Sequence, residues 1–149
     1  MITQNRKIGI LGGGSWATAL VKLLHENVSQ VNWFLRDPEN IDYLKKYHHN
    51  KHYLESITFD TNRIRFYHNL NAIADESDIL IAAIPAAFLQ AALQELTHSL
   101  NGKIIVSAIK GIIPEDNLII ADFFREYFNI SLSNFVVISG PCHAEEVAL

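Results

Sequence analysis

The sequence contains little of several residue types, and each shortage excludes a class of protein. Among its 149 residues there is 1 cysteine, Cys142, so no internal disulfide is possible and a reducing compartment is expected. With only 4 prolines and 7 glycines, the chain is not a low-complexity sequence. Its longest apolar run, residues 79–89, is shorter than the roughly 20 residues that cross a bilayer. We therefore expect a soluble, cytoplasmic protein without membrane insertion.

Positive charge is scarce as well. Lys and Arg number 12 against 16 Asp and Glu, which gives a formal net charge of −4. A mildly acidic chain is a poor partner for nucleic acid or for an anionic membrane surface. Apolar residues make up 49% of the sequence and charged residues 19%, which is enough to build a buried core at this length. We expect one globular domain, with no nucleic acid among its partners.

Short apolar runs alternate with helical patterns from one end of the chain to the other. The runs predict strands over residues 7–11, 31–35, 63–67, 79–84, 104–109 and 135–139. Helices are predicted over residues 16–25, from 38 onward, over 86–96, over 115–128 and from near Pro141, with a loop over 48–62. Strands that alternate with helices indicate βαβ units. We expect an α/β fold, a doubly wound, mostly parallel sheet of the Rossmann type, in a single domain over residues 1–149.

The first predicted strand is followed by Gly12-Gly13-Gly14-Ser15-Trp16-Ala17, a G-x-G-x-x-A fingerprint. Because a strand precedes it and a helix follows it, the motif stands in the βαβ context that dinucleotide binding requires. Gly12 permits the tight turn, Gly14 lets the backbone approach a pyrophosphate, and Ala17 allows close packing of helix on strand. The N-terminus of the helix offers free N–H groups to the phosphates. The sequence therefore predicts a nucleotide site at this loop.

The second predicted strand ends at Leu35-Arg36-Asp37, where a ribose ligand is expected. An NAD-specific site commonly has a carboxylate at this point. Asp37 precedes Pro38, so it is better suited to cap the next helix, with Pro38 in the first helical position. Arg36 then remains, and its guanidinium suits a 2′-phosphate or stacks on adenine. We interpret the site as one for NAD(P), with a preference for NADP.

Other strand ends also carry candidate residues, since ligands of open α/β sheets bind at the carboxyl ends of the strands. The fourth strand ends before Pro85, the fifth before Lys110-Gly111, and the sixth before Gly140-Pro141. Lys110 puts a cation at this edge that can meet an anionic substrate, although a lone lysine after a strand is more often simply solvated. Gly140 likewise marks either an anion-binding helix entrance or an ordinary cap.

Together these motifs resemble a known family. The glycine fingerprint, Lys110-Gly111, and Ser139-Gly140-Pro141 followed by residues 144–148 occur in the order and spacing of the N-terminal domain of bacterial NAD(P)-dependent sn-glycerol-3-phosphate dehydrogenases. The resemblance covers essentially the whole chain. It implies the nucleotide domain of an oxidoreductase that reversibly reduces dihydroxyacetone phosphate to sn-glycerol 3-phosphate, which supplies phospholipid synthesis.

The resemblance also implies roles for individual residues. Besides Gly12, Gly14 and Pro85 at the strand ends, the implied nucleotide contacts are Ser15, Trp16, Arg36, Tyr53, Lys110 and Ala144. Tyr53 matches the aromatic position of an Asn-x-x-aromatic-Leu segment, here Asn50 to Leu54. Lys110 is implied to be catalytic and to touch both cofactor and substrate, with Gly140 and Cys142 on the substrate side. Cys142-His143 stands where Ser or Thr followed by Phe is usual, and a thiol is a weaker donor than a hydroxyl.

The second domain of this family is helical, and the resemblance implies that it holds another catalytic lysine, the phosphate-binding residues and much of a homodimer interface. The last predicted helix has no C-cap signal before Leu149, so we expect this domain to follow the chain. The implied chemistry is hydride transfer from a nicotinamide to the carbonyl of a small phosphorylated substrate. Lys110 would hold the substrate and stabilise charge on its oxygen. By itself the chain is then a cofactor-binding fragment without turnover.

Other interpretations stay open at this point. Another two-domain dehydrogenase, such as a ketopantoate reductase or a β-hydroxyacid dehydrogenase, would share the fold, although the pairing of Lys110-Gly111 with Gly140-Pro141 disfavours it. A non-catalytic nucleotide-sensing module would bind NAD(H) and need no substrate-side lysine. A metal site is not expected, because the loop with His48, His49 and His52 lacks a convergent set of ligands.

Overall fold

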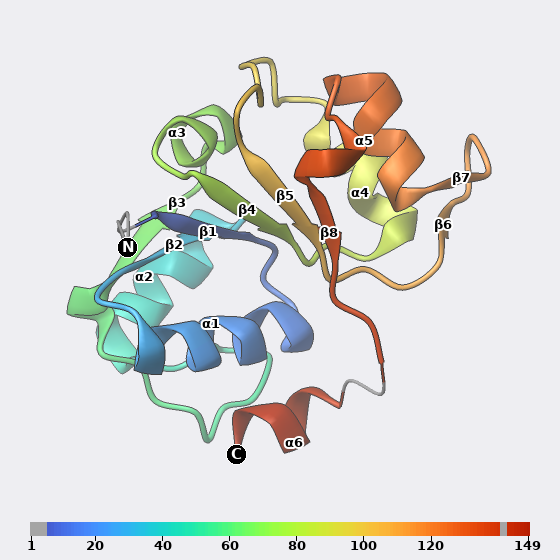
Figure 1. The fold of residues 1–149 in the computed structure, drawn as a ribbon. Coiled ribbons are helices and arrows are strands. Elements are labelled where there is room, and N and C mark those ends of the chain that lie inside the picture. The colour runs from blue at the N-terminus through green and yellow to red at the C-terminus, as the bar shows by residue number, and fades with distance from the viewer. Residues whose placement is uncertain (1–5, 141–142) are drawn as a thin grey trace.

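In the computed structural model, which describes residues 6–140 and 143–149, the chain forms a twisted parallel sheet with helices on both faces (Figure 1). The sheet has six strands in the order β3-β2-β1-β4-β5-β8. Their bounds are β1 Ile8–Leu11, β2 Val31–Phe34, β3 Ile64–Tyr67, β4 Ile79–Ala82, β5 Ile104–Ser107 and β8 Phe135–Val137. All five neighbouring pairs are parallel. The predicted doubly wound fold is confirmed.

Two hydrophobic clusters, one on each face of the sheet, make up the core. Helices α1 (Ser15–Asn27), α2 (Pro38–Tyr47) and α6 (Ala144–Ala148) cover one face, and α3 (Leu70–Asp75), α4 (Ala86–Leu93) and α5 (Ile120–Phe128) cover the other (Figure 1). Successive strand residues point to opposite faces. Ile10 packs against the α1 side and Leu11 against the α4 side. Short 3₁₀ turns precede β3 (Thr61–Arg63) and β8 (Leu132–Asn134).

The order of the strands fixes where a ligand can enter. From the central strand β1 the chain winds outward through β2 and β3, then crosses back to β4 and winds outward on the other side. The loops after β1 and β4 therefore leave the sheet in opposite directions and open a crevice between them. The glycine fingerprint follows β1 and Pro85 follows β4, so both border this crevice.

One predicted helix begins later than expected. Instead of a helix from residue 115, an antiparallel hairpin of β6 (Ile112–Ile113) and β7 (Leu118–Ile119) precedes α5, which begins at Ile120. The turn includes Asn117 with a positive φ of 54°, a conformation that suits Asn and ends helical periodicity. The Tyr127 hydroxyl of α5 donates to the Asp116 carboxylate at 2.7 Å, which raises the pKa of Tyr127. This bond ties the helix to the hairpin.

Most other boundaries agree with the prediction to within one or two residues. The predicted cap of α2 is confirmed, because the Asp37 carboxylate accepts a hydrogen bond from the Glu39 amide at 3.0 Å and Pro38 begins the helix. Helix α3 was not predicted, since six residues carry too little periodicity. The final helix begins at Ala144 and packs on α1, whereas Pro141, where it was expected to start, lies outside the described residues.

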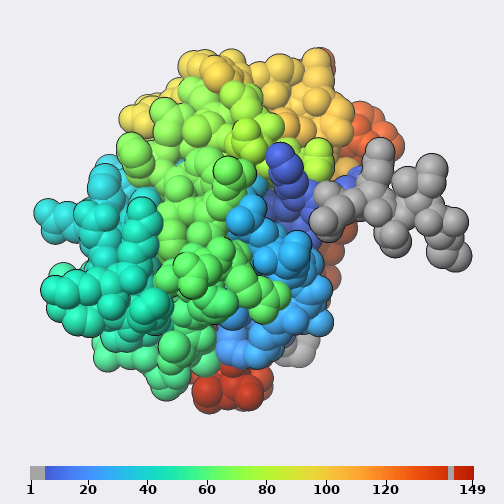
Figure 2. All heavy atoms as spheres, turned by 90° about the vertical axis from the view of Figure 1, so that its left-hand side faces the viewer, coloured from blue at the N-terminus to red at the C-terminus, as the bar shows by residue number. Residues whose placement is uncertain are grey.

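Figure 2 shows α2 and the loop after it, coloured cyan to teal, on one side of the molecule, and α6 in red at its lower end. The loop over residues 48–62 is irregular as predicted, apart from its closing 3₁₀ turn. Among the described residues, no helix is long and apolar enough to cross a bilayer.

Candidate functional site

The turn after β1 can be made only by glycine. Gly12 has a φ of +132°, and a Cβ on it would lie 2.7 Å from the backbone oxygen of Ala83, in the loop after β4. A side chain there would be both strained and in collision with backbone. The predicted role of Gly12 in the tight turn is confirmed, and its lack of a side chain lets the two crevice loops approach each other closely.

Gly14 has a different geometry. It is the N-cap residue of α1, with an ordinary negative φ of −79° and no side-chain cap on the helix. A Cβ on Gly14 would meet nothing within 4 Å, so the space above it is open. Ser15 begins the helix beside this space, and Ala17 is fully buried one turn on, which confirms the predicted close packing. The uncapped N–H groups of a 13-residue helix thus face open space, as a phosphate site needs.

Two side chains from elsewhere in the chain hold the glycine loop in place. The indole Nε1 of Trp33 in β2 donates to the carbonyl oxygen of Gly12 at 2.7 Å. The fully buried Asn50 donates from Nδ2 to the carbonyl oxygen of Gly13 at 3.2 Å and to the Thr18 hydroxyl at 2.9 Å. The irregular loop that carries Tyr53 is therefore hydrogen-bonded to the glycine loop.

A cavity of about 720 Å³ lies on the β2 and β3 side of the crevice. Its walls combine the glycine loop, residues that follow β2, β3 and β4, and one side of α4. The lining residues are Gly12, Gly13, Gly14, Phe34, Arg36, Tyr53, His68, Leu70, Ala83, Ile84, Pro85, Phe88, Ala91, Ala92 and Glu95. Three predicted contacts, Arg36, Tyr53 and Pro85, are thus brought together with the fingerprint glycines. This volume suits the adenosine half of a dinucleotide.

Arg36 is the basic side chain just after β2, where a ribose ligand is expected. The Oδ1 atom of its neighbour Asp37 accepts the hydrogen bond that caps α2, as described above. Within residues 6–140 and 143–149, none of the ion pairs involves Arg36, and its side chain is exposed. Its guanidinium is therefore available to a ligand in the cavity.

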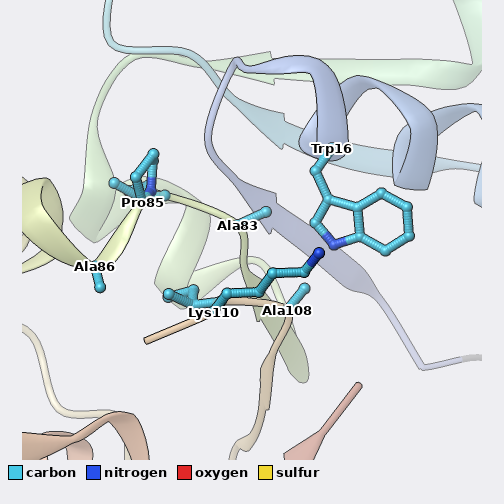
Figure 3. Close-up of a pocket in the computed structure, with 8 residues that line it drawn as sticks. Trp16, Ala83, Pro85, Ala86, Ala108 and Lys110 are labelled. Carbon is cyan, nitrogen blue, oxygen red and sulfur yellow. The ribbon is translucent and has the colours of Figure 1, made fainter. Parts of the chain in front are cut away.

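A second, smaller pocket of about 260 Å³ lies on the β5 side. It shares Ala83, Ile84 and Pro85 with the larger cavity and adds Trp16, Ala86, Ala108, Ile109 and Lys110. In Figure 3 the Lys110 amine and the Trp16 indole point toward one another across this pocket. The two cavities thus share the wall formed by residues 83–85, and the glycine loop borders the larger one. An extended ligand with its middle at Gly14 would have one end beside Arg36 and the other beside Lys110.

Among the described residues, three predicted contacts do not line either cavity: Ser15, Ala144 and Gly140. Ala144 is buried in the packing of α6 on α1. Gly140 has a φ of +125°, as a turn glycine, and is exposed. Cys142 lies outside the described residues. Within the part of the chain that the structure describes, no three metal-ligating side chains gather, the histidines of the 48–62 loop included.

The structure also brings in residues that the sequence did not single out. His68, directly after β3, and Glu95, just beyond α4, both line the larger cavity. His68 could have been found by the rule that served for Arg36 and Lys110, since it too follows a strand of the sheet. The sequence marks Asn50 only as the first residue of the Asn-x-x-aromatic-Leu segment and gives no sign of its bonds to partners 32 and 37 residues away.

The fold and the site together define a dinucleotide-binding domain of the Rossmann class. They combine a parallel sheet of this strand order, a glycine turn at the N-terminus of an uncapped helix, and a crevice with two parts. The family model for the N-terminus of NAD-dependent glycerol-3-phosphate dehydrogenase matches residues 7–149. The chain belongs to this family.

Curated relatives and solved structures agree with this assignment. The chain is 33% identical over 145 residues to the glycerol-3-phosphate dehydrogenase [NAD(P)+] of Streptococcus pneumoniae, and 35% identical over 141 residues to that of Streptococcus suis. These matches cover 96% and 93% of the chain but only 43% and 41% of the relatives. The crystal structure of glycerol-3-phosphate dehydrogenase from Coxiella burnetii aligns with a TM-score of 0.79 at 25% identity, covering 96% of the chain and 43% of that structure.

Proposed function

We propose that the chain is the cofactor-binding part of an NAD(P)-dependent glycerol-3-phosphate dehydrogenase, which reduces dihydroxyacetone phosphate to sn-glycerol 3-phosphate. The observation that carries the proposal is the position of Lys110. This lysine follows β5, lines the smaller pocket opposite Trp16, and has none of the ion pairs found among the described residues. A cation at this edge suits a reaction in which negative charge develops on a substrate oxygen.

The residues around the crevice fit a dinucleotide. Gly14 and the N-terminus of α1 would hold the pyrophosphate, Arg36 and Tyr53 the adenosine half, and Trp16 and Pro85 the nicotinamide side. Arg36, with Asp37 used as a helix cap, supports a preference for NADP over NAD. Ser15, Ala144, Gly140 and Cys142 remain predicted contacts.

Lys110 would bind and orient the substrate. When bound, a reduced nicotinamide would supply a hydride to the carbonyl carbon of the substrate, and negative charge would develop on the carbonyl oxygen beside Lys110. An ammonium group already in place beside that oxygen stabilises the charge without having to reorganise. We expect the proton to come from a lysine of a further domain, which would also supply the phosphate-binding residues and most of a homodimer interface. We place the reaction in the cytoplasm.

The experiment that tests this function uses the complete protein. The substitution Lys110→Met keeps the length of the side chain and removes its charge. We expect it to lower the rate of dihydroxyacetone phosphate reduction by about 10²–10³, with little change in NADPH affinity. Steady-state rates and separate NADPH titrations distinguish the two effects.

The controls separate this function from its rivals. The 149-residue chain alone should bind NADPH and show no turnover. A near-normal rate in the Lys110→Met variant would overturn the role of the lysine. Reduction of ketopantoate or a β-keto acid in place of dihydroxyacetone phosphate would identify another dehydrogenase. Tight nucleotide binding without turnover of any of these substrates would indicate a sensing module.

A further inference from the structure

We infer that His68 is a specificity-determining residue, which together with Arg36 binds the 2′-phosphate of NADP(H). The inference rests on the proposed function, since it requires the adenosine half of a dinucleotide in the larger cavity. His68 would be a second contact to this phosphate, in addition to Arg36, which the sequence predicts there.

The register of the sheet brings the two side chains to the same edge. Strands β2 and β3 are parallel neighbours with Phe34 opposite Tyr67, and the Leu35 amide donates to the Tyr67 carbonyl at 2.9 Å. Arg36 follows Leu35 and His68 follows Tyr67, just beyond the ends of the two strands. Both side chains are exposed, and both line the larger cavity with the glycine loop. An anion that reaches Arg36 from the cavity is therefore within the same recess as His68.

The charged and titratable groups that line this cavity come from four segments. They are Arg36 after β2, Tyr53 in the irregular loop, His68 after β3 and Glu95 beyond α4. Asp37 caps α2, and Asn69, next to His68, caps α3 by accepting from the Ala72 amide at 3.0 Å. Across residues 6–140 and 143–149, the hydrogen bonds and ion pairs include none from the His68 side chain. The imidazole is thus open to a ligand rather than committed to the fold.

Histidine changes charge between pH 5 and 8. When protonated, it would donate to a phosphate oxygen with a charge-assisted bond; when neutral, it would contribute less. NADH has a hydroxyl where NADPH has the 2′-phosphate, so only NADPH gains from the charge. His68 should therefore contribute to the affinity for NADPH and not to the affinity for NADH. The phosphate gains its own second negative charge near pH 6, which strengthens the contact with Arg36 as pH rises. Only a comparison of variants at the same pH isolates the imidazole.

The test titrates the 149-residue chain with NADPH and with NADH at pH 6, following nucleotide fluorescence. The variants are His68→Gln and, as a matched control, His98→Gln, because His98 is also exposed but pairs with Asp75 at 2.9 Å, outside the cavity. We expect His68→Gln to weaken NADPH binding about two- to fivefold. NADH binding should stay unchanged, and His98→Gln should bind both nucleotides as the wild type does.

Each other result is decisive. Equal losses for NADPH and NADH would show that His68 acts on the shape of the cavity and would overturn the inference. Unchanged NADPH binding at pH 6 by a folded variant, checked by circular dichroism, would also overturn it and leave the proposed function intact. Failure of the wild type to bind either nucleotide would overturn the proposed function and, with it, the inference.

Discussion

Trp33 and Gly12 are joined by a buried hydrogen bond, in which the indole Nε1 donates to the glycine carbonyl at 2.7 Å. Trp33 is fully buried in β2, and Gly12 holds its positive φ at the first position of the fingerprint. The geometry of the phosphate loop is thus set partly by a core side chain of the neighbouring strand. A core substitution at this position should therefore affect binding as well as stability.

The substitution Trp33→Phe keeps an aromatic ring in the core and removes the indole donor. We expect the free energy of unfolding to fall by about 1–3 kcal/mol, since the Gly12 carbonyl loses its buried partner. Urea denaturation followed by circular dichroism measures this. Trp16→Phe is the matched control, because Trp16 is half-buried and lines the smaller pocket. Equal stability losses in the two variants would contradict the assigned role of the Trp33 bond.

Substitution of Gly12 should reduce stability, whereas substitution of Gly14 should reduce nucleotide binding. Gly12→Ala should lower the free energy of unfolding by about 1–3 kcal/mol, because it combines a positive φ with a 2.7 Å approach to the Ala83 oxygen. Gly14→Val should leave the fold intact, since its Cβ meets nothing within 4 Å, and should abolish NADPH binding by filling the open space. Thermal unfolding and NADPH fluorescence titration check both. Undiminished binding by folded Gly14→Val would show that the pyrophosphate lies elsewhere.

Substitutions of Arg36 and of Asp37 should also affect different properties, nucleotide binding in the first case and stability in the second. Arg36→Ala should weaken NADPH binding about ten- to hundredfold, the loss of a charge-assisted bond of roughly 1.5–3 kcal/mol, with a smaller effect on NADH. Asp37→Ala should instead lower stability by about 0.5–2 kcal/mol, as a lost helix cap does, and leave NADH affinity unchanged. Calorimetric titration and urea denaturation separate the two. Equal losses for both nucleotides would assign Arg36 to adenine stacking, and a large NADH loss in Asp37→Ala would make that carboxylate a ribose ligand.

The sequence was sufficient for the sheet because each strand is a short apolar run buried on both faces. Several strands were predicted to be too long, because apolar residues remain buried beyond the point where the hydrogen bonds between the strands end. Leu35 and Ile84 are still buried, at 2% and 9% exposure, but belong to loops. The β6–β7 hairpin was missed because four ladder residues give no period that differs from the start of a helix.

For the site, the sequence predicted the positions of residues that lie within three residues of the end of a strand. Parallel strands end at a common edge, so Arg36, Pro85 and Lys110 could be placed near the fingerprint before the fold was known. Asn50 could not, because its role depends on a bond to a glycine carbonyl 37 residues away. Neither composition nor periodicity encodes such a contact.

The bonds of Asn50 have a consequence for local opening. The Oδ1 atom of the Asn50 side chain also accepts a hydrogen bond from the backbone amide of His52 at 3.0 Å. Asn50 therefore joins the segment before Tyr53 to both Gly13 and α1. A buried group with three partners cannot lose one segment without leaving polar atoms unsatisfied. We therefore expect the Tyr53 segment and the phosphate loop to open and close as one cooperative unit. A ligand that orders the Tyr53 segment should then also stabilise the phosphate loop through this amide.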